Sequence, residues 1–243
     1  MNPNLRCVAV IPARFGSTRF PGKPLALLAG KPMIQHVWER VQKARGLLRT
    51  VVATDDERIA RAVTGFGGEV AMTGECPTGT DRVCKAVRDL DVDVVLNVQG
   101  DQPLIEPAPL ESLLAAFEDK AVRMATLKRP LEPGDAENPN MVKVACARNG
   151  DALYFSRSLI PFPRNDGTPA WAHIGVYAYR KDFLIEVTAM PQTPLEHAEC
   201  LEQLRVLEHG HRIRVVETTH RGFGVDTPED LKKARARIDT MFA

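Results

Sequence analysis

Short apolar runs and amphipathic stretches alternate along the first half of the chain. Runs rich in β-branched residues predict buried strands over residues 8–11, 50–54, 69–72 and 93–98. Between them, apolar residues that recur every three or four positions predict helices over residues 33–44, 55–61 and 107–118, with a further helix after residue 82. This alternation predicts an α/β fold, in which a mainly parallel sheet carries helices on both faces.

The rhythm changes near residue 128, where proline, glycine, asparagine and charged residues predict a linker over 128–140. We interpret residues 129–180 as a smaller mixed lobe, and residues 1–128 with 181–243 as the main α/β domain, the two forming one catalytic unit. The remaining pattern predicts strands over 121–127, 141–147, 152–155 and 212–216, and helices over 194–209 and 228–240.

The first loop of the predicted sheet carries candidate chemistry. Ligands of parallel sheets bind beyond the carboxyl ends of the strands, so the loops after residues 11, 54, 72 and 98 should line one crevice. The first of them contains two glycines and no acid, and its cations are Arg14, Arg19 and Lys23. Glycine lets backbone N–H groups approach an anion, and the cations offset its charge, so this loop predicts a polyphosphate site.

Better-known phosphate motifs do not account for this loop. Pro24 stands where a P-loop needs Ser or Thr, and there is one residue too many between Gly16 and Gly22. The dinucleotide motif G-x-G-x-x-G is absent from the chain. An ordinary solvated loop is the alternative interpretation.

A carboxylate follows the strongly apolar strand over 93–98. Asp101 comes just after Gly100, in a position where a magnesium ion bound to a nucleotide would need a hard oxygen ligand. A role in a β-turn is the alternative. Asp91 and Asp93 also have a D-x-D form, but they precede the strand and should lie at the opposite edge of the sheet.

Composition narrows the class of protein. The chain has 243 residues, of which 44% are hydrophobic and 26% charged, with a formal net charge of +1. This near-neutral charge argues against a nucleic-acid partner but not against a nucleotide substrate. No apolar stretch reaches about 18 residues, so neither export nor membrane spanning is predicted. The five scattered cysteines contain no C-x-x-C pair, which disfavours zinc or a disulfide framework and fits a cytoplasmic location.

Several motifs together resemble one known family. Residues 11–25 read I-P-A-R-x-x-S-T-R-x-P-G-K-P-L, and residues 30–34 read G-K-P-M-I. Further blocks are T-G-T-D-R at 78–82, Q-G-D at 99–101, L-E-Q-L-R at 201–205 and G-V-D-T-P-E-D-L at 224–231. This set resembles the sugar-acid cytidylyltransferases, in particular the 3-deoxy-manno-octulosonate cytidylyltransferase (CMP-Kdo synthetase) family.

The resemblance implies a fold, a reaction and partners. The fold would be the Rossmann-like sheet of nucleotide-diphospho-sugar transferases. The reaction would couple CTP to the 2-keto sugar acid 3-deoxy-manno-octulosonate (Kdo), giving CMP-Kdo and pyrophosphate for lipopolysaccharide biosynthesis. The cofactor would be Mg²⁺, and the smaller lobe would make homodimer contacts.

The resemblance also assigns roles to individual residues. It implies that Asp101 and Asp226 hold the metal and act in catalysis with Arg14 and Lys23. The implied nucleotide-binding residues are Pro12, Ala13, Arg14, Lys23, Thr54, Asp55, Gly79, Thr80 and Arg82. The implied sugar-binding residues are Gln99, Arg157, His173, Tyr177, Glu202 and Gln203, with Arg157 suited to clamp a carboxylate bidentately.

Other interpretations of these residues remain open. Thr80 could be a helix N-cap, Arg82 a solvated charge, and Asp226 part of the start of the last helix. Gln102 replaces a glutamate that many family members carry, which points to a subfamily that uses another sugar, such as 8-amino-Kdo. A non-catalytic nucleotide-sensing module is the alternative from a different functional class.

Overall fold

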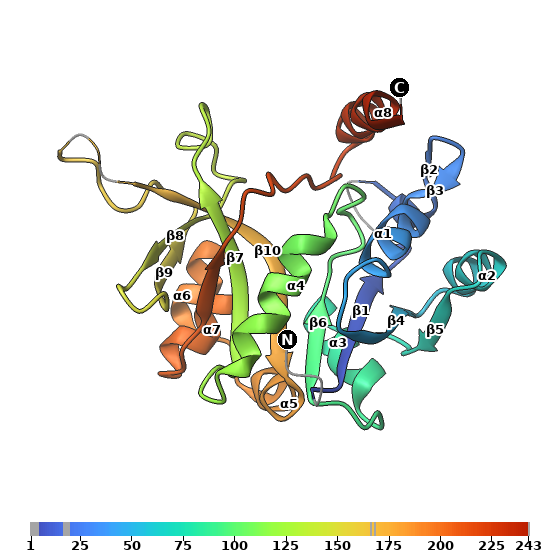
Figure 1. Cartoon of the computed structure of the whole chain (residues 1–243), viewed down its shortest axis with the longest axis horizontal. Helices are drawn as coiled ribbons and strands as arrows, with labels where there is room; N and C mark the ends of the chain where they lie inside the picture. The colour runs from blue at the N-terminus through green and yellow to red at the C-terminus, as the bar shows by residue number, and fades with distance from the viewer. Residues whose placement is uncertain (1–4, 17–19, 166, 168, 243) are drawn as a thin grey trace.

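The protein is described from a computed structural model that covers residues 5–16, 20–165, 167 and 169–242. Within these residues a nine-stranded sheet runs in the order β11-β7-β10-β6-β1-β4-β5, with β8 and β9 at the side of β10 (Figure 1). Its strands are β1 (Cys7–Ala13), β4 (Leu47–Thr54), β5 (Glu69–Met72), β6 (Val94–Asn97), β7 (Met124–Pro130), β8 (Lys143–Cys146), β9 (Ala152–Ser156), β10 (Trp171–Arg180) and β11 (Arg214–Glu217).

Helices cover both faces of this sheet, as the sequence pattern predicts. They are α1 (Met33–Val41), α2 (Glu57–Gly65), α3 (Gly79–Val87), α4 (Pro107–Ala115), α5 (Lys181–Ala189), α6 (Pro194–Glu199), α7 (Gln203–Glu208) and α8 (Pro228–Phe242). The apolar sides of α1, α2 and α4 pack in one core, and those of α3, α5 and α7 in another. In Figure 1, α4 lies in front of the sheet. Short 3₁₀ helices are η1 (Lys23–Leu25) and η2 (Ala116–Glu118), and β2 (Leu27–Leu28) pairs with β3 (Lys31–Pro32).

The half of the sheet formed by β5, β4, β1 and β6 is parallel. β1 lies between β4 and β6 and pairs with both in parallel, and every residue of β1 is buried. The apolar run predicts that this strand ends at residue 11, but β1 continues to Ala13. The pairing of β1 with β6 ends at Val10. Pro12 has no N–H to donate on that side, and no hydrogen bond is lost there because β6 no longer pairs with β1.

The second half of the sheet departs from the α/β rhythm. β10 runs antiparallel between β6 and β7, while β11 pairs with β7 in parallel. Within the segment 129–180, β8 and β9 form an antiparallel pair beside β10, and β10 itself belongs to the central sheet. The division of the chain at residues 129 and 180 remains a prediction.

The helix predicted over 194–209 is wrong as one element. α6 ends at Cys200, which adopts a left-handed backbone with φ of 51°, and α7 begins at Gln203. This break folds α7 back, so that the Arg205 guanidinium reaches the Glu196 carboxylate at 2.8 and 2.6 Å. The apolar spacing continues through the break, but Leu195 at its start is 39% exposed.

The final helix starts as the sequence predicts. The Thr227 hydroxyl accepts a hydrogen bond from the Asp230 N–H, and the Asp230 carboxylate accepts one from the Thr227 N–H. Ala234 and Ile238 then pack against the apolar cluster of Leu28 and Met33. Among the helices described, none has the length and apolar character to cross a membrane.

Candidate active site

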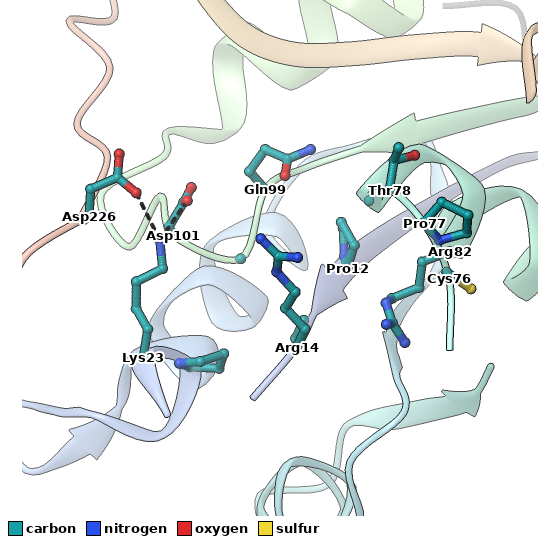
Figure 2. A pocket seen from close by; sticks show the side chains of 14 residues that line it. Pro12, Arg14, Lys23, Cys76, Pro77, Thr78, Arg82, Gln99, Asp101 and Asp226 are labelled. Atoms are coloured by element: carbon teal, nitrogen blue, oxygen red, sulfur yellow. Dashed lines mark hydrogen bonds and ion pairs between the residues drawn. The ribbon is translucent and has the colours of Figure 1, made fainter. Parts of the chain in front are cut away.

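A cleft opens at the carboxyl ends of β1 and β6, where the sheet topology predicts a ligand site. Its volume is about 330 Å³, within the range of small-molecule sites. Its lining residues come from the end of β1, the loop after it and η1, from the loop after β5 and the start of α3, from the loop after β6, and from the segment before α8 (Figure 2). They are Pro12, Ala13, Arg14, Lys23, Pro24, Cys76, Pro77, Thr78, Gly79, Arg82, Gln99, Gly100, Asp101 and Asp226.

Lys23 owes its position to the glycine before it. Gly22 has a φ of 70°, and a Cβ there would lie 3.1 Å from the Phe15 ring, so a larger residue would be strained on two counts. The Gly22 N–H donates to the Phe15 carbonyl at 3.0 Å, and η1 then begins at Lys23. The exposed Arg14 lines the same cleft, whereas Arg19 lies outside the described residues.

The ammonium of Lys23 lies between the two carboxylates predicted to bind metal. Its Nζ donates to Asp101 Oδ2 at 2.9 Å and to Asp226 Oδ1 at 3.1 Å (Figure 2). A backbone bond from the Val225 N–H to the Asp101 carbonyl, 2.8 Å long, joins the two segments. In Figure 1 the segment before α8 crosses over the end of the sheet from β11. The fold thus brings together two acids that are remote in sequence.

A close approach of two backbones fixes the Asp101 loop. A Cβ on Gly100 would lie 2.9 Å from the carbonyl oxygen of Pro12, a separation that a real side chain does not tolerate. The glycine therefore allows the loop after β6 to rest on the end of β1. Asp101 is placed beside the basic loop because of this contact.

The N-terminus of α3 forms another side of the cleft. Its N-cap is Thr78, not Thr80, and Thr78 makes a reciprocal capping box with Asp81. Gly79 lines the cleft, while Thr80 is buried and lines a neighbouring cavity. The alternative reading of Thr80 as an N-cap is wrong, because the helix begins two residues earlier.

Arg82 is buried instead of being a solvated charge. Its guanidinium donates to Asp55 Oδ2 at 2.6 Å and to Thr73 Oγ1 at 2.7 Å. It thereby ties the loops after β4 and β5 to α3. Thr54 is fully buried, and its carbonyl accepts the Thr73 N–H at 2.9 Å. Thr54 and Asp55 do not line the cleft themselves. They are linked to its lining residue Arg82, Asp55 directly and Thr54 by way of Thr73.

Two further cavities lie beside the cleft, and most of the predicted sugar-binding residues line them. The first has a volume of about 140 Å³ and shares Gly79 and Gln99 with the cleft. The second has a volume of about 340 Å³ and shares Tyr177 and Gln203 with the first. Together the two adjoining cavities are lined by five of the six residues: Gln99, His173, Tyr177, Glu202 and Gln203.

Burial keeps His173 and Tyr177, which line these cavities, in their neutral forms. It lowers the pKa of His173 to about 3, so the imidazole is neutral at neutral pH. The Thr126 hydroxyl donates to the Val176 carbonyl at 2.9 Å and therefore accepts from His173 Nε2 at the same distance. Burial, together with the charge of Glu202, raises the pKa of Tyr177, which stays a neutral phenol.

Arg157 lies apart from these cavities. Its Nε donates to the Glu199 carbonyl at 2.7 Å, and its guanidinium also donates to the Pro139 carbonyl at 3.0 Å. In the described part of the chain it is absent from the lining of the cleft and of both cavities. Its role as a carboxylate clamp remains a prediction.

Asn97 is a functional candidate that the sequence analysis missed. Its Oδ1 accepts the Gln99 Nε2–H at 3.0 Å, so it orients the residue shared by the cleft and the first cavity. Its own Nδ2 is buried and has no hydrogen-bond partner. A polar residue inside the apolar run 94–98 was the available signal. Cys76 and Pro77 were also missed.

Comparisons with known proteins agree with this geometry. A family model described as cytidylyltransferase matches residues 8–213. A solved CMP:2-keto-3-deoxy-manno-octonic acid synthetase, complexed with CTP, superposes with a TM-score of 0.94 at 44% identity, covering 97% of this chain and 99% of that one. The 4-diphosphocytidyl-2C-methyl-D-erythritol synthase of Anaerococcus prevotii, at 13% identity and a TM-score of 0.67, shares the fold.

The chain therefore belongs to the cytidylyltransferase family. Its relatives at about half identity carry the name 3-deoxy-manno-octulosonate cytidylyltransferase. The protein from Myxococcus xanthus is 54% identical, over 95% of this chain and 96% of its own length. The protein from Geobacter sulfurreducens is 51% identical, over 96% of this chain and 100% of its own length. The resemblance seen in the sequence motifs is confirmed.

Proposed function

We propose that this protein transfers the CMP group of CTP to Kdo, a step in lipopolysaccharide biosynthesis, and releases pyrophosphate. The observation that carries the proposal is the row of adjoining cavities: the cleft shares Gly79 and Gln99 with the first cavity, and the first shares Tyr177 and Gln203 with the second. At one end, Lys23 of the basic loop after β1 meets Asp101 and Asp226, beside Arg14, in a cleft suited to a triphosphate. At the other, His173 and Tyr177 offer neutral polar groups to a sugar.

The reaction needs positioning more than covalent catalysis. The anomeric hydroxyl of the sugar acid attacks the α-phosphorus, the bond to the bridging oxygen breaks, and pyrophosphate leaves. Arg14 and Lys23 stabilise charge on the departing phosphates from the loop after β1. Gln99 lies where the cleft meets the first cavity, so it is placed to orient the attacking end of the sugar.

The carboxylate pair fits a magnesium ion. Asp101 and Asp226 supply hard oxygens that already converge on one cation, the ammonium of Lys23. Among the described residues no group of three His, Cys, Asp or Glu side chains could hold a metal, and magnesium commonly uses one or two carboxylates plus phosphates. When bound, the ion would neutralise phosphate charge and lower the pKa of the attacking hydroxyl.

The remaining elements of the proposal concern the sugar carboxylate and the assembly. Arg157 can clamp the carboxylate only if its guanidinium leaves the carbonyls of Glu199 and Pro139. A homodimer through residues 129–180 is proposed from the family resemblance, and light scattering after gel filtration tests it. Use of CTP supports a cytoplasmic location.

The test is pyrophosphate release from CTP with magnesium, measured with Kdo and with 8-amino-Kdo. Release with Kdo is the expected result. Release with 8-amino-Kdo alone keeps the chemistry and changes the sugar. Gln102 is the residue to examine then, because it lines the second cavity and its buried Oε1 has no partner. Magnesium-independent CTP binding without release would favour the sensing module.

The Glu202→Gln variant should be more stable and less active than the wild type. Burial raises the pKa of Glu202 in the folded protein, so ionising this carboxyl costs stability. The variant should therefore melt at a higher temperature than the wild type, by the full amount at pH values above the raised pKa of Glu202 in the folded protein. This difference should disappear as the pH falls to the ordinary pKa of a glutamate, where the carboxyl is protonated in both the folded and the unfolded protein. Loss of a charged hydrogen-bond partner for the sugar should lower kcat/KM by about 10–100-fold.

Calorimetry at several pH values measures the change in melting temperature, and steady-state kinetics at varied sugar concentration measures the change in kcat/KM. The exposed Glu217→Gln is the matched control and should change neither quantity. A Glu202→Gln variant with unchanged kcat/KM would remove Glu202 from the sugar site.

A further inference from the structure

We infer that Lys23 is an internal counter-ion of the Asp101–Asp226 pair, and that a divalent cation replaces it when the nucleotide binds. This inference rests on the proposed function, since it concerns the same carboxylates. The observation behind it is the place of the ammonium, which bonds both acids at 2.9 and 3.1 Å, where a metal ion would also have to lie. The Lys23 side chain is 14% exposed, and those of Asp101 and Asp226 are 31% and 47% exposed, so solvent screens the two ion pairs in part.

A backbone hydrogen bond holds together the two segments that carry these carboxylates. The Val225 N–H bond to the Asp101 carbonyl joins their segments, and the Asp226 N–H donates to Asp230 at 3.2 Å within the α8 cap. Two anions held in this way repel each other and attract a cation. Lys23 meets that need in the nucleotide-free protein, because its ammonium reaches both acids.

Lys23 and a metal ion cannot occupy the same place. Magnesium binds carboxylate oxygens at about 2.0–2.1 Å, which would leave two cations in contact if the ammonium remained. Lysine has a flexible stem and rotatable donors, and Lys23 lines the same cleft as Arg14 and Gly79. The displaced ammonium can therefore turn to the triphosphate that arrives with the metal.

This exchange couples the two ligands. A metal ion binding alone must remove Lys23 from two ion pairs and leave it without an anion. A metal ion binding with a triphosphate gives Lys23 new partners, so each ligand should strengthen the binding of the other. Free magnesium should accordingly bind the nucleotide-free protein weakly.

The test measures Mn²⁺ binding to the nucleotide-free protein by electron paramagnetic resonance. Lys23→Met should bind Mn²⁺ about tenfold more tightly than the wild type, the scale of two partly exposed ion pairs. Lys31→Met is the matched control, because it removes the same charge from a surface pair with Glu39, and its affinity should equal that of the wild type. Lys23→Gln provides a second uncharged variant, and thermal unfolding verifies that both variants fold.

The outcomes separate this inference from the proposed function. Unchanged Mn²⁺ affinity in both folded Lys23 variants would overturn the counter-ion role. A gain that Asp226→Asn abolishes in the Lys23→Met background supports it. If that gain is seen while the wild type releases no pyrophosphate with Kdo, the counter-ion role stands and the proposed function falls.

Discussion

Asp101→Asn is expected to reduce pyrophosphate release by at least about 10²–10³-fold, because a neutral amide neither holds a divalent cation firmly nor offsets its charge. The fold should survive the change. Asparagine has nearly the same volume, and the bond that ties this loop to the segment before α8 uses the backbone carbonyl of residue 101. Coupled detection of pyrophosphate measures the rate, and calorimetry measures the melting temperature.

Asp91→Asn is the matched control for Asp101→Asn. Its carboxylate pairs with Arg6 before β6, at the opposite edge of the sheet, and is 88% exposed. The same chemical change there should leave the rate unaltered. A folded Asp101→Asn variant that turns over like the wild type would contradict the proposed metal role of Asp101.

The carboxylates of Asp101 and Asp226 show how much of the candidate site could be predicted from the sequence. Asp101 could be placed at the cleft by physics alone, because it follows a buried parallel strand and such strands end at the ligand-binding edge. Asp226 could not, because local chemistry explains the start of α8 without a ligand. Only the family resemblance connected it to Asp101, and the structure adds the backbone bond that makes the contact.

Most strands and helices were predictable for the same reason that they form, although β10 and α5 were not among them. Buried β-branched runs and amphipathic spacing determine them locally, and the observed β5 has the predicted bounds. The observed contacts of Arg157, with Glu199 and Pro139, could not be predicted from the sequence, because they come from distant segments. The role of Asn97 was not noticed, because its partner Gln99 lies outside the strand. Periodicity reports which face of an element is apolar, but it does not report which carbonyl or amide lies opposite a side chain.

The break between α6 and α7 is the clearest failure of the pattern, and it leads to a prediction of stability. Arg205→Met should lower the free energy of unfolding by about 3–5 kcal/mol, because it leaves the buried Glu196 carboxylate without its cation. The pair is bidentate, at 2.8 and 2.6 Å, and both side chains are less than a tenth exposed. For a chain of this length the melting temperature should fall by roughly 6–20 °C.

Two comparisons isolate the buried charge as the cause of that loss. Glu196→Gln combined with Arg205→Met removes both charges and keeps an acceptor for the Thr193 N–H of the α6 cap, so it should recover much of the stability. Arg49→Met, which breaks an exposed pair with Glu69, should cost less than about 1 kcal/mol. A double variant no more stable than Arg205→Met would show that packing, and not charge, is responsible.

The same pair also connects stability to the proposed sugar site. The turn that Arg205 and Glu196 hold together carries Glu202 and Gln203 into the cavities next to Tyr177. Below its melting temperature, Arg205→Met should therefore raise KM for the sugar while leaving KM for CTP unchanged, because the cleft proposed for CTP is lined from β1, α3 and the loop after β6, and not from α6 or α7. An equal rise in both constants would mean that the α6–α7 turn supports the whole site and not the sugar cavities alone.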